Sequence, residues 1–153
     1  MSNNKSYSGL YTIRNPSKYR GDPNNIRWRS LWERKLCEYF DFNPSIISWS
    51  LEPFPIPYLN PLDRKYHRYF VDFWVKIKDK NGVISERLIE VKPYYQTVEP
   101  KKPDKINKKY AYDMQNWIIN NSKWEAAKKL CEQKDWKFTV ITEKTIFGKK
   151  NDQ

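Results

Sequence analysis

Two apolar segments that a short turn would join each carry an acidic residue at a central position. The first covers residues 70–74 and contains Asp72, and the second covers residues 88–92 and contains Glu90. Residues 79–82, Asp-Lys-Asn-Gly, are typical of a turn between two antiparallel strands. A carboxylate in an apolar setting takes up a proton unless it has a cation to hold. The pattern therefore predicts a β-hairpin whose two acids hold a cation.

The spacing also places a lysine beside these acids. Residues i and i+2 of a strand point to the same face, so Glu90 and Lys92 should project together, with Asp72 roughly opposite them. Hard oxygen ligands suit Mg²⁺ or Mn²⁺, which polarise a phosphoryl oxygen and activate a bound water. Lys92 would orient or deprotonate that water, or neutralise charge in the transition state. Two strand-edge acids and an ordinary Glu90–Lys92 ion pair are the alternative interpretation.

The length and the cysteines indicate one reduced, soluble domain. A chain of 153 residues can bury a sufficient core without a disulfide or a metal. Cys37 and Cys131 lie in helix-like segments beside apolar neighbours, and they are interpreted as reduced core residues of a cytosolic-type protein. There is no long apolar run and no signal peptide, so we expect no membrane association. His67 is the sole histidine, which argues against a zinc cluster.

The charge and the aromatic content favour a nucleic-acid partner. The formal net charge is +11, and the chain has seven Trp, eleven Tyr and seven Phe. Basic side chains attract phosphate backbones, and exposed aromatic faces stack on unpaired bases. A solvated basic surface over an aromatic core would have the same composition.

The order of expected elements predicts an α/β fold with a mixed sheet flanked by helices. A basic, irregular arm (1–25) precedes the domain (26–147), and a polar tail (148–153) follows it. The expected elements are a helix at 30–42, strands at 46–50, 54–58, 66–78 and 85–92, helices at 105–120 and 122–134, and a strand at 136–141. The helical crossover allows the last strand to run parallel to an earlier one.

Two helix starts carry the capping-box pattern Ser-x-x-Glu, at Ser30 to Glu33 and at Ser122 to Glu125. In a capping box, Glu33 would reach back to the amide of Ser30. This gives Glu33 a structural explanation that does not require a role in a site.

At this point the chain resembles a known family. An acid before a hairpin turn, followed by Glu90-Val91-Lys92, resembles the PD-(D/E)-x-K nuclease superfamily with its restriction-endonuclease-like αβββαβ core, although Val71 replaces the usual proline. The wider context is similar to the small head-completion nucleases of tailed bacteriophages and, more distantly, to the endonuclease subunit of a cut-and-paste transposition system. The segments that carry this resemblance are residues 15–21 (NPSKYRG), 29–33 (RSLWE), 43–50 (NPSIISWS), 56–58 (IPY) and 67–73 (HRYFVDF).

The resemblance implies catalytic roles for Glu33, Asp72, Glu90 and Lys92, with Asp72 and Glu90 as metal ligands. It implies Mg²⁺ as cofactor, for which Mn²⁺ could substitute, and double-stranded DNA as substrate. It further implies trimming of packaged DNA so that heads can join tails, in the host cytoplasm, with portal or neck proteins as partners and the virion as a destination.

Five residues are expected to contact the DNA backbone: Arg14, Lys18, Arg20, His67 and Arg68. Any such charge can instead simply face water. Because the sequence has no helix-turn-helix or zinc-finger pattern, the function expected is a Mg²⁺-dependent DNA endonuclease of low sequence specificity. The alternatives are a non-catalytic DNA-binding or portal-binding adaptor on a nuclease fold, and an RNA-binding module, for which no RNP-type motif is present.

Overall fold

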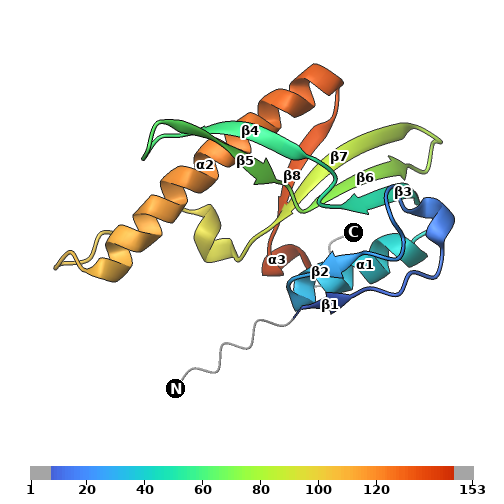
Figure 1. The fold of residues 1–153 in the computed structure, drawn as a ribbon, viewed down its shortest axis with the longest axis horizontal. Helices are drawn as coiled ribbons and strands as arrows, with labels where there is room; N and C mark the ends of the chain where they lie inside the picture. Colours follow the sequence, from blue (N-terminus) through green and yellow to red (C-terminus); the bar gives the residue numbers. More distant parts are fainter. Residues whose placement is uncertain (1–7, 147–153) are drawn as a thin grey trace.

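A four-stranded mixed sheet forms the centre of the computed structural model, which describes residues 8–146 (Figure 1). Its strands are β3 (Ile46–Leu51), β6 (Phe73–Lys78), β7 (Ile84–Val91) and β8 (Lys137–Ile141), in the order β3-β6-β7-β8. β3, β6 and β7 pair antiparallel, and β8 pairs parallel to β7. The expected α/β class, the 79–82 turn and the parallel last strand are therefore confirmed.

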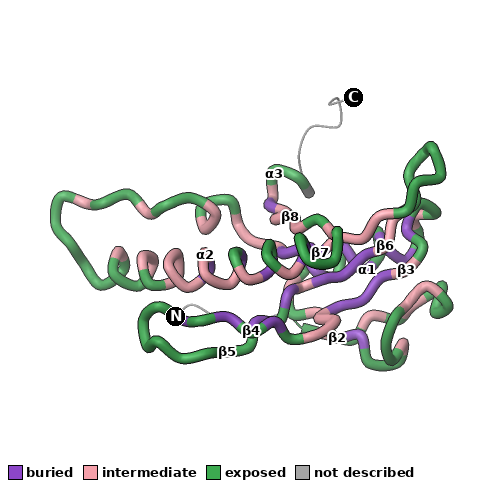
Figure 2. Tube along the Cα trace, turned by 90° about the horizontal axis from the view of Figure 1, so that it is seen from above, coloured by how far each residue is buried: buried purple, intermediate pink, exposed green. Residues whose placement is uncertain are grey.

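Helices cover both faces of this sheet because its strands alternate between two apolar faces. Phe73 and Val75 pack with α1 (Leu31–Phe42) in one core cluster. Trp74, which points the other way, packs in a second cluster with α2 (Lys108–Lys134). The buried positions run through the sheet between these layers (Figure 2).

A separate hairpin lies with α2 on the second face. It consists of β4 (Pro55–Asn60) and β5 (Lys65–Phe70), which pair only with each other. The strand expected over 66–78 is thus wrong as a single element, because the chain leaves β5 at Val71 and Asp72 before it enters the main sheet as β6. This break places Asp72 at the beginning of a central strand.

The helix α2 also differs from the expectation of two helices, 105–120 and 122–134. It is continuous from Lys108 to Lys134, with Asn107 as N-cap. Ser122 does not cap a second helix: its hydroxyl donates to the carbonyl oxygen of Ile118 at 3.3 Å, as serines inside helices do. The first half of α2, the loop before it and the β4–β5 hairpin extend beyond the four-stranded sheet (Figures 1 and 2).

The N-terminal segment, expected to be irregular, contains short elements: β1 (Gly9–Leu10), paired with β2 (Arg27–Trp28), and a 3₁₀ turn at Pro16–Lys18. It is attached to the end of α1 through Asp41, which is 1% exposed. The Asp41 carboxylate accepts hydrogen bonds from the Tyr11 hydroxyl (2.6 Å) and from the backbone amides of Arg14 (2.8 Å) and Asn15 (2.9 Å). Residues 8–25 are therefore packed against the domain, and the start of the expected arm and the polar tail lie outside the described residues.

Two short elements complete the fold, a 3₁₀ turn at Tyr94–Thr97 after β7 and α3 (Glu143–Ile146) after β8. Among the helices of residues 8–146, none combines the length and the apolar character that crossing a membrane requires.

Candidate active site

Asp72 and Glu90 meet at the end of the β6–β7 hairpin opposite to its turn. Asp72 directly precedes β6 and Glu90 is the penultimate residue of β7, where the register pairs Phe73 with Ile89. The two acids therefore face each other across the strands, as expected. The Asp72 Oδ2 atom accepts a hydrogen bond of 2.7 Å from the Val91 amide, which fixes its side chain toward β7.

The environment of the Asp72 carboxylate disfavours negative charge. Glu90 is only 4% exposed. Burial, followed by the adjacent Glu90 carboxylate, raises the pKa of Asp72 well above its ordinary value. A proton or a metal cation would relieve the repulsion between the two acids, so the pair has the character of a cation site.

Two aromatic residues that were not among the predicted site residues lie beside the two acids. Trp124 of α2 donates its indole N–H to Oε2 of Glu90 at 3.2 Å. Tyr69 of β5 is 3% exposed, and its hydroxyl has no hydrogen-bond partner within the described part of the chain. Burial, then Glu90 and Asp72, raise the pKa of this hydroxyl. A buried hydroxyl without a partner beside two carboxylates suits a site that receives a further polar group.

Lys92 is positioned directly after β7. Its amide donates to the carbonyl oxygen of Ile141 at 3.0 Å, which ties the end of β7 to the end of β8. Lys92 lines a hollow of about 550 Å³ together with residues 29–32 at the start of α1 and with Gln96. The predicted catalytic lysine thus borders a space that a substrate can enter.

Lys123 of α2 is a second lysine at the site, and sequence reasoning missed it. Its Nζ lies 5.8 Å from the ring centroids of both Tyr58 and Tyr69. Burial, and then the nearby Lys92 ammonium, lower the pKa of Lys123, while Glu90 and Asp72 act in the opposite direction. The Ser122–Glu125 pattern had suggested a helix start here, and only the contact of α2 with the sheet shows that Lys123 is near the acids.

Glu33 combines the capping role with a position near the acids. The Ser30 hydroxyl accepts from the Glu33 amide at 3.1 Å, and Oε2 of Glu33 accepts from the amide of Arg29 at 3.2 Å. The expected return bond to the Ser30 amide is therefore replaced by one to Arg29. Glu33 is 8% exposed, its pKa is raised mainly by burial, and its charge contributes to the raised pKa of Asp72.

A fourth acid, Glu52, lies beside the site after β3. Its amide donates to the Asp72 carbonyl oxygen at 2.8 Å, and its carboxylate pairs with Arg29. The backbone of Glu52 is left-handed, with φ of 48°, an uncommon conformation for this residue type. The negative charge of Glu52 also raises the pKa of Glu33.

The five expected DNA contacts do not form one group. Arg14 and Lys18 lie near Asp41, at the opposite end of α1 from Glu33. Asp41 follows Glu33 by eight helical residues, which correspond to about 12 Å along the helix axis. Lys18 donates its Nζ to the carbonyl oxygens of Asp41 and Asn43, both at 2.9 Å.

The other three candidates also have contacts within the protein. The Arg20 guanidinium lies 4.5 Å from the Trp74 ring centroid, and that of Arg68 lies 5.7 Å from the Phe70 ring centroid. His67 contacts Asp63 at 2.6 Å. His67 and Arg68 are exposed on β5, whose next residue, Tyr69, borders the acids. Their contact with DNA stays a prediction, as does that of the other three.

The donor set fits a hard divalent cation. Asp72 and Glu90 would supply carboxylate oxygens, and the Tyr69 hydroxyl is a further polar group beside them. Residues 8–146 contain no group of three or more His, Cys, Asp or Glu side chains that could hold an ion. With two carboxylates as ligands, the remaining coordination positions of such a cation would be filled by water.

Comparisons with known proteins identify the family. The model of the TnsA-like endonuclease N-terminal domain matches residues 43–143, more than half of the chain and the part that contains Asp72, Glu90 and Lys92. The head completion nuclease of enterobacteria phage T4 is 41% identical over 142 residues, which cover 90% of this chain and 92% of that protein. No solved structure matches the chain. The chain therefore belongs to the TnsA-like endonuclease family and is a homologue of the phage T4 head completion nuclease.

Proposed function

We propose that the chain is a Mg²⁺-dependent DNA endonuclease with little sequence preference. The observation that carries the proposal is the pair formed by the half-buried Asp72 and the buried Glu90, which face each other two residues before Lys92 in a chain of an endonuclease family. The family generally needs a divalent metal, and Mg²⁺ is the ion that the two carboxylates suit best. DNA is the substrate that a nuclease of this family would cleave.

Each residue has a distinct role in this proposal. Asp72 and Glu90 would hold Mg²⁺, which polarises a phosphoryl oxygen and lowers the pKa of a bound water when it is present. Lys92 would orient the attacking water and balance the charge that develops at phosphorus. Glu33 would act at the edge of the site, where its negative charge raises the pKa of Asp72. Trp124 would position Glu90 by its hydrogen bond.

The low sequence preference is inferred from the elements that surround the site. Within residues 8–146 there is no helix-turn-helix or zinc-finger module that could read base edges. Contacts to phosphates position a duplex without reading its sequence. The candidates for such contacts are Arg14, Arg20, His67 and Arg68. Lys18 is a further candidate if it is released from the carbonyl oxygens of Asp41 and Asn43.

The biological role proposed is head completion in a tailed phage. The phage T4 relative is a head completion nuclease, and we infer that this chain likewise trims packaged DNA so that filled heads can join tails. It would then act in the host cytoplasm during assembly, bind portal or neck proteins and remain in the virion.

Nicking of supercoiled plasmid tests the catalytic proposal. We expect the wild-type protein to relax the plasmid in Mg²⁺ and not in EDTA, and we expect Lys92→Ala to lose at least about 100-fold in rate, as is typical when a charge-stabilising group is removed. Lys78→Ala is the matched control, since Lys78 is an exposed lysine at the far end of the same hairpin. The wild-type protein and the same two variants, supplied to phage T4 that lacks its head completion nuclease, test whether cleavage is needed for infectious particles.

An intact plasmid with folded, DNA-bound wild-type protein would contradict the nuclease proposal and favour the adaptor alternative. Equal nicking by wild type and Lys92→Ala would remove Lys92 from the mechanism. Complementation by Lys92→Ala as good as that by wild type would show that the role in assembly does not depend on cleavage.

A further inference from the structure

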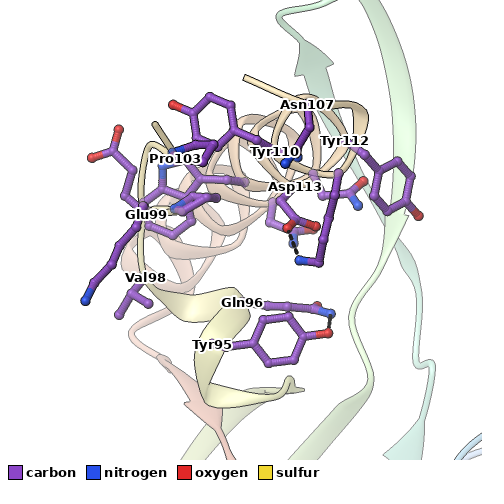
Figure 3. A pocket seen from close by; sticks show the side chains of 15 residues that line it. Tyr95, Gln96, Val98, Glu99, Pro103, Asn107, Tyr110, Tyr112 and Asp113 are labelled. Carbon is purple, nitrogen blue, oxygen red and sulfur yellow. Dashed lines mark hydrogen bonds and ion pairs between the residues drawn. The ribbon is translucent and has the colours of Figure 1, made fainter. Parts of the chain in front are cut away.

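A second cavity, of about 620 Å³, lies outside the acidic site, between the segment after Lys92 and the first half of α2. Figure 3 shows Tyr95 and Gln96 on one wall and Asp113 of α2 facing them, with Tyr112 of α2 to one side of Asp113. This part of the chain extends beyond the four-stranded sheet (Figure 1). The volume is typical of a pocket for a small ligand or a single base, and too small for a duplex.

The walls of this cavity present aromatic rings to solvent. Tyr95 is 66% exposed and Tyr112 is 65% exposed, so neither ring serves the core. The Gln96 side chain donates to the Tyr95 hydroxyl at 3.0 Å, which restricts that ring. Exposed and partly fixed aromatic rings are the groups on which unpaired bases stack, with little dependence on sequence because every base has a π-face.

The chain around the cavity is strongly basic. Between positions 99 and 109 there are two acids and five lysines: Glu99, Asp104, Lys101, Lys102, Lys105, Lys108 and Lys109. The five lysines are exposed. Lys109 pairs with Asp113 at 2.7 Å, which neutralises the acid inside the cavity. This positive charge attracts a phosphate backbone and repels a basic peptide.

The cavity adjoins the hollow beside the predicted catalytic lysine. Gln96 lines both spaces, and it follows Lys92 by only four residues. Four residues span at most about 14 Å even when fully extended. A nucleic-acid strand that passes Lys92 would therefore reach Tyr95 within a few nucleotides of the cleaved bond.

We propose that this aromatic and basic pocket binds an unpaired stretch of the DNA strand adjacent to the cleavage site. The proposal rests on the proposed nuclease function and names its substrate more closely, as DNA with a single-stranded end or a locally opened duplex. Tyr95 and Tyr112 provide the stacking surfaces, and the lysines of residues 101–109 contact the phosphates.

Fluorescence anisotropy in EDTA, which prevents cleavage, tests the proposal with a labelled oligothymidylate of about 16 nucleotides and a hairpin duplex of similar charge. We expect Tyr95→Ala and Tyr112→Ala each to weaken single-strand binding about tenfold, by the loss of one stacking contact. Duplex binding should change less than about twofold, and Tyr95→Phe should bind like wild type because it keeps the ring. Tyr39→Ala is the control, since Tyr39 is 56% exposed on α1 and does not line the pocket.

Unchanged single-strand affinity in both folded alanine variants would overturn the proposal, and so would an equal loss for the single strand and the duplex. Plasmid nicking by the same proteins in Mg²⁺ keeps the two proposals separate. A wild type that nicks, with alanine variants that bind single strands normally, contradicts only the pocket proposal. A wild type that does not nick, with tyrosine-dependent single-strand binding, contradicts only the nuclease proposal.

Discussion

At the scale of single residues, the ionisation of Asp72 depends strongly on its surroundings in the fold. Its pKa is raised by burial and by Glu90, while the hydrogen bond from the Val91 amide opposes the shift. The folded protein without metal therefore binds a proton at Asp72 more readily than the unfolded chain does. The corresponding stability is fully present below the unfolded pKa near 4 and is lost as the pH rises through the folded value.

Asp72→Asn should remove this pH dependence. In EDTA at about pH 8, we expect the variant to be more stable than wild type by about 1–3 kcal/mol, because asparagine needs no proton and still accepts from Val91. At about pH 4 the difference should shrink. Urea unfolding at both pH values measures it, with Asp104→Asn, a change at an exposed acid, as control. Parallel pH profiles for wild type and Asp72→Asn would contradict the raised pKa.

Lys123 is expected to contribute to the transition state. Its Nζ faces Tyr58 and Tyr69 close to the acids, so its charge can balance charge developing on the phosphate. Lys123→Met keeps the length and the apolar stem, and we expect kcat for nicking to fall about 10- to 100-fold with little change in KM. Lys129→Met, at an exposed position on the same helix, should behave like wild type. A higher KM at unchanged kcat would instead assign Lys123 to ground-state binding.

The positions of some site residues could be predicted from the sequence, and those of others could not. Asp72 and Glu90 could be placed opposite each other because both lie on one hairpin, whose turn and period-2 pattern are local features. Trp124 and Lys123 reach the same site from a helix 34 and 33 positions after Glu90. Their approach depends on how α2 packs on the sheet, which no local pattern specifies.

At the scale of elements, one four-residue pattern has two outcomes. Ser-x-Trp-Glu occurs at 30–33 and at 122–125. Ser30 caps α1 because the preceding chain is extended at Ser30, with φ of −150° and ψ of 158°. Ser122 lies inside α2, where the helix already propagates from Asn107 and each added residue gains a backbone hydrogen bond. The pattern permits a cap, and the preceding residues decide whether one forms.

The matched pair Ser30→Ala and Ser122→Ala tests this distinction. We expect Ser30→Ala to lower the free energy of unfolding by about 1 kcal/mol, because the Glu33 amide loses its acceptor. Ser122→Ala should change it by less than about 0.5 kcal/mol, since alanine is a good helix former and the bond to Ile118 adds little. Urea unfolding of both variants at one pH gives the comparison. Equal losses would indicate that α2 is not continuous in solution.

At the scale of the whole molecule, the sheet order explains why the site lies where it does. The three antiparallel strands bring the acids to one end of the β6–β7 hairpin, and the parallel β8 can pair with β7 only because α2 crosses over the sheet. The same crossover carries Trp124 to Glu90. The expected class and strand directions followed from element order, whereas the separate β4–β5 sheet did not, because its strands read locally like members of the main sheet.

The net charge of the whole chain leads to a last prediction, about specificity. A formal charge of +11 without a base-reading module makes phosphate contacts the main source of affinity. In EDTA, we expect duplex affinity to fall about 1000-fold between about 50 and 200 mM salt, as it does for proteins with six or more phosphate contacts.

Two duplexes of equal length and scrambled sequence should differ less than about tenfold in affinity at any one salt concentration. Anisotropy titrations with both duplexes across the salt range measure the slope and the preference together. A preference of 1000-fold or more for one duplex, which is the range of specific DNA-binding proteins, would show that some element of this fold reads bases. A shallow slope with weak binding would instead indicate that most of the basic side chains already engage partners within the protein, as Lys18 does with the last carbonyls of α1.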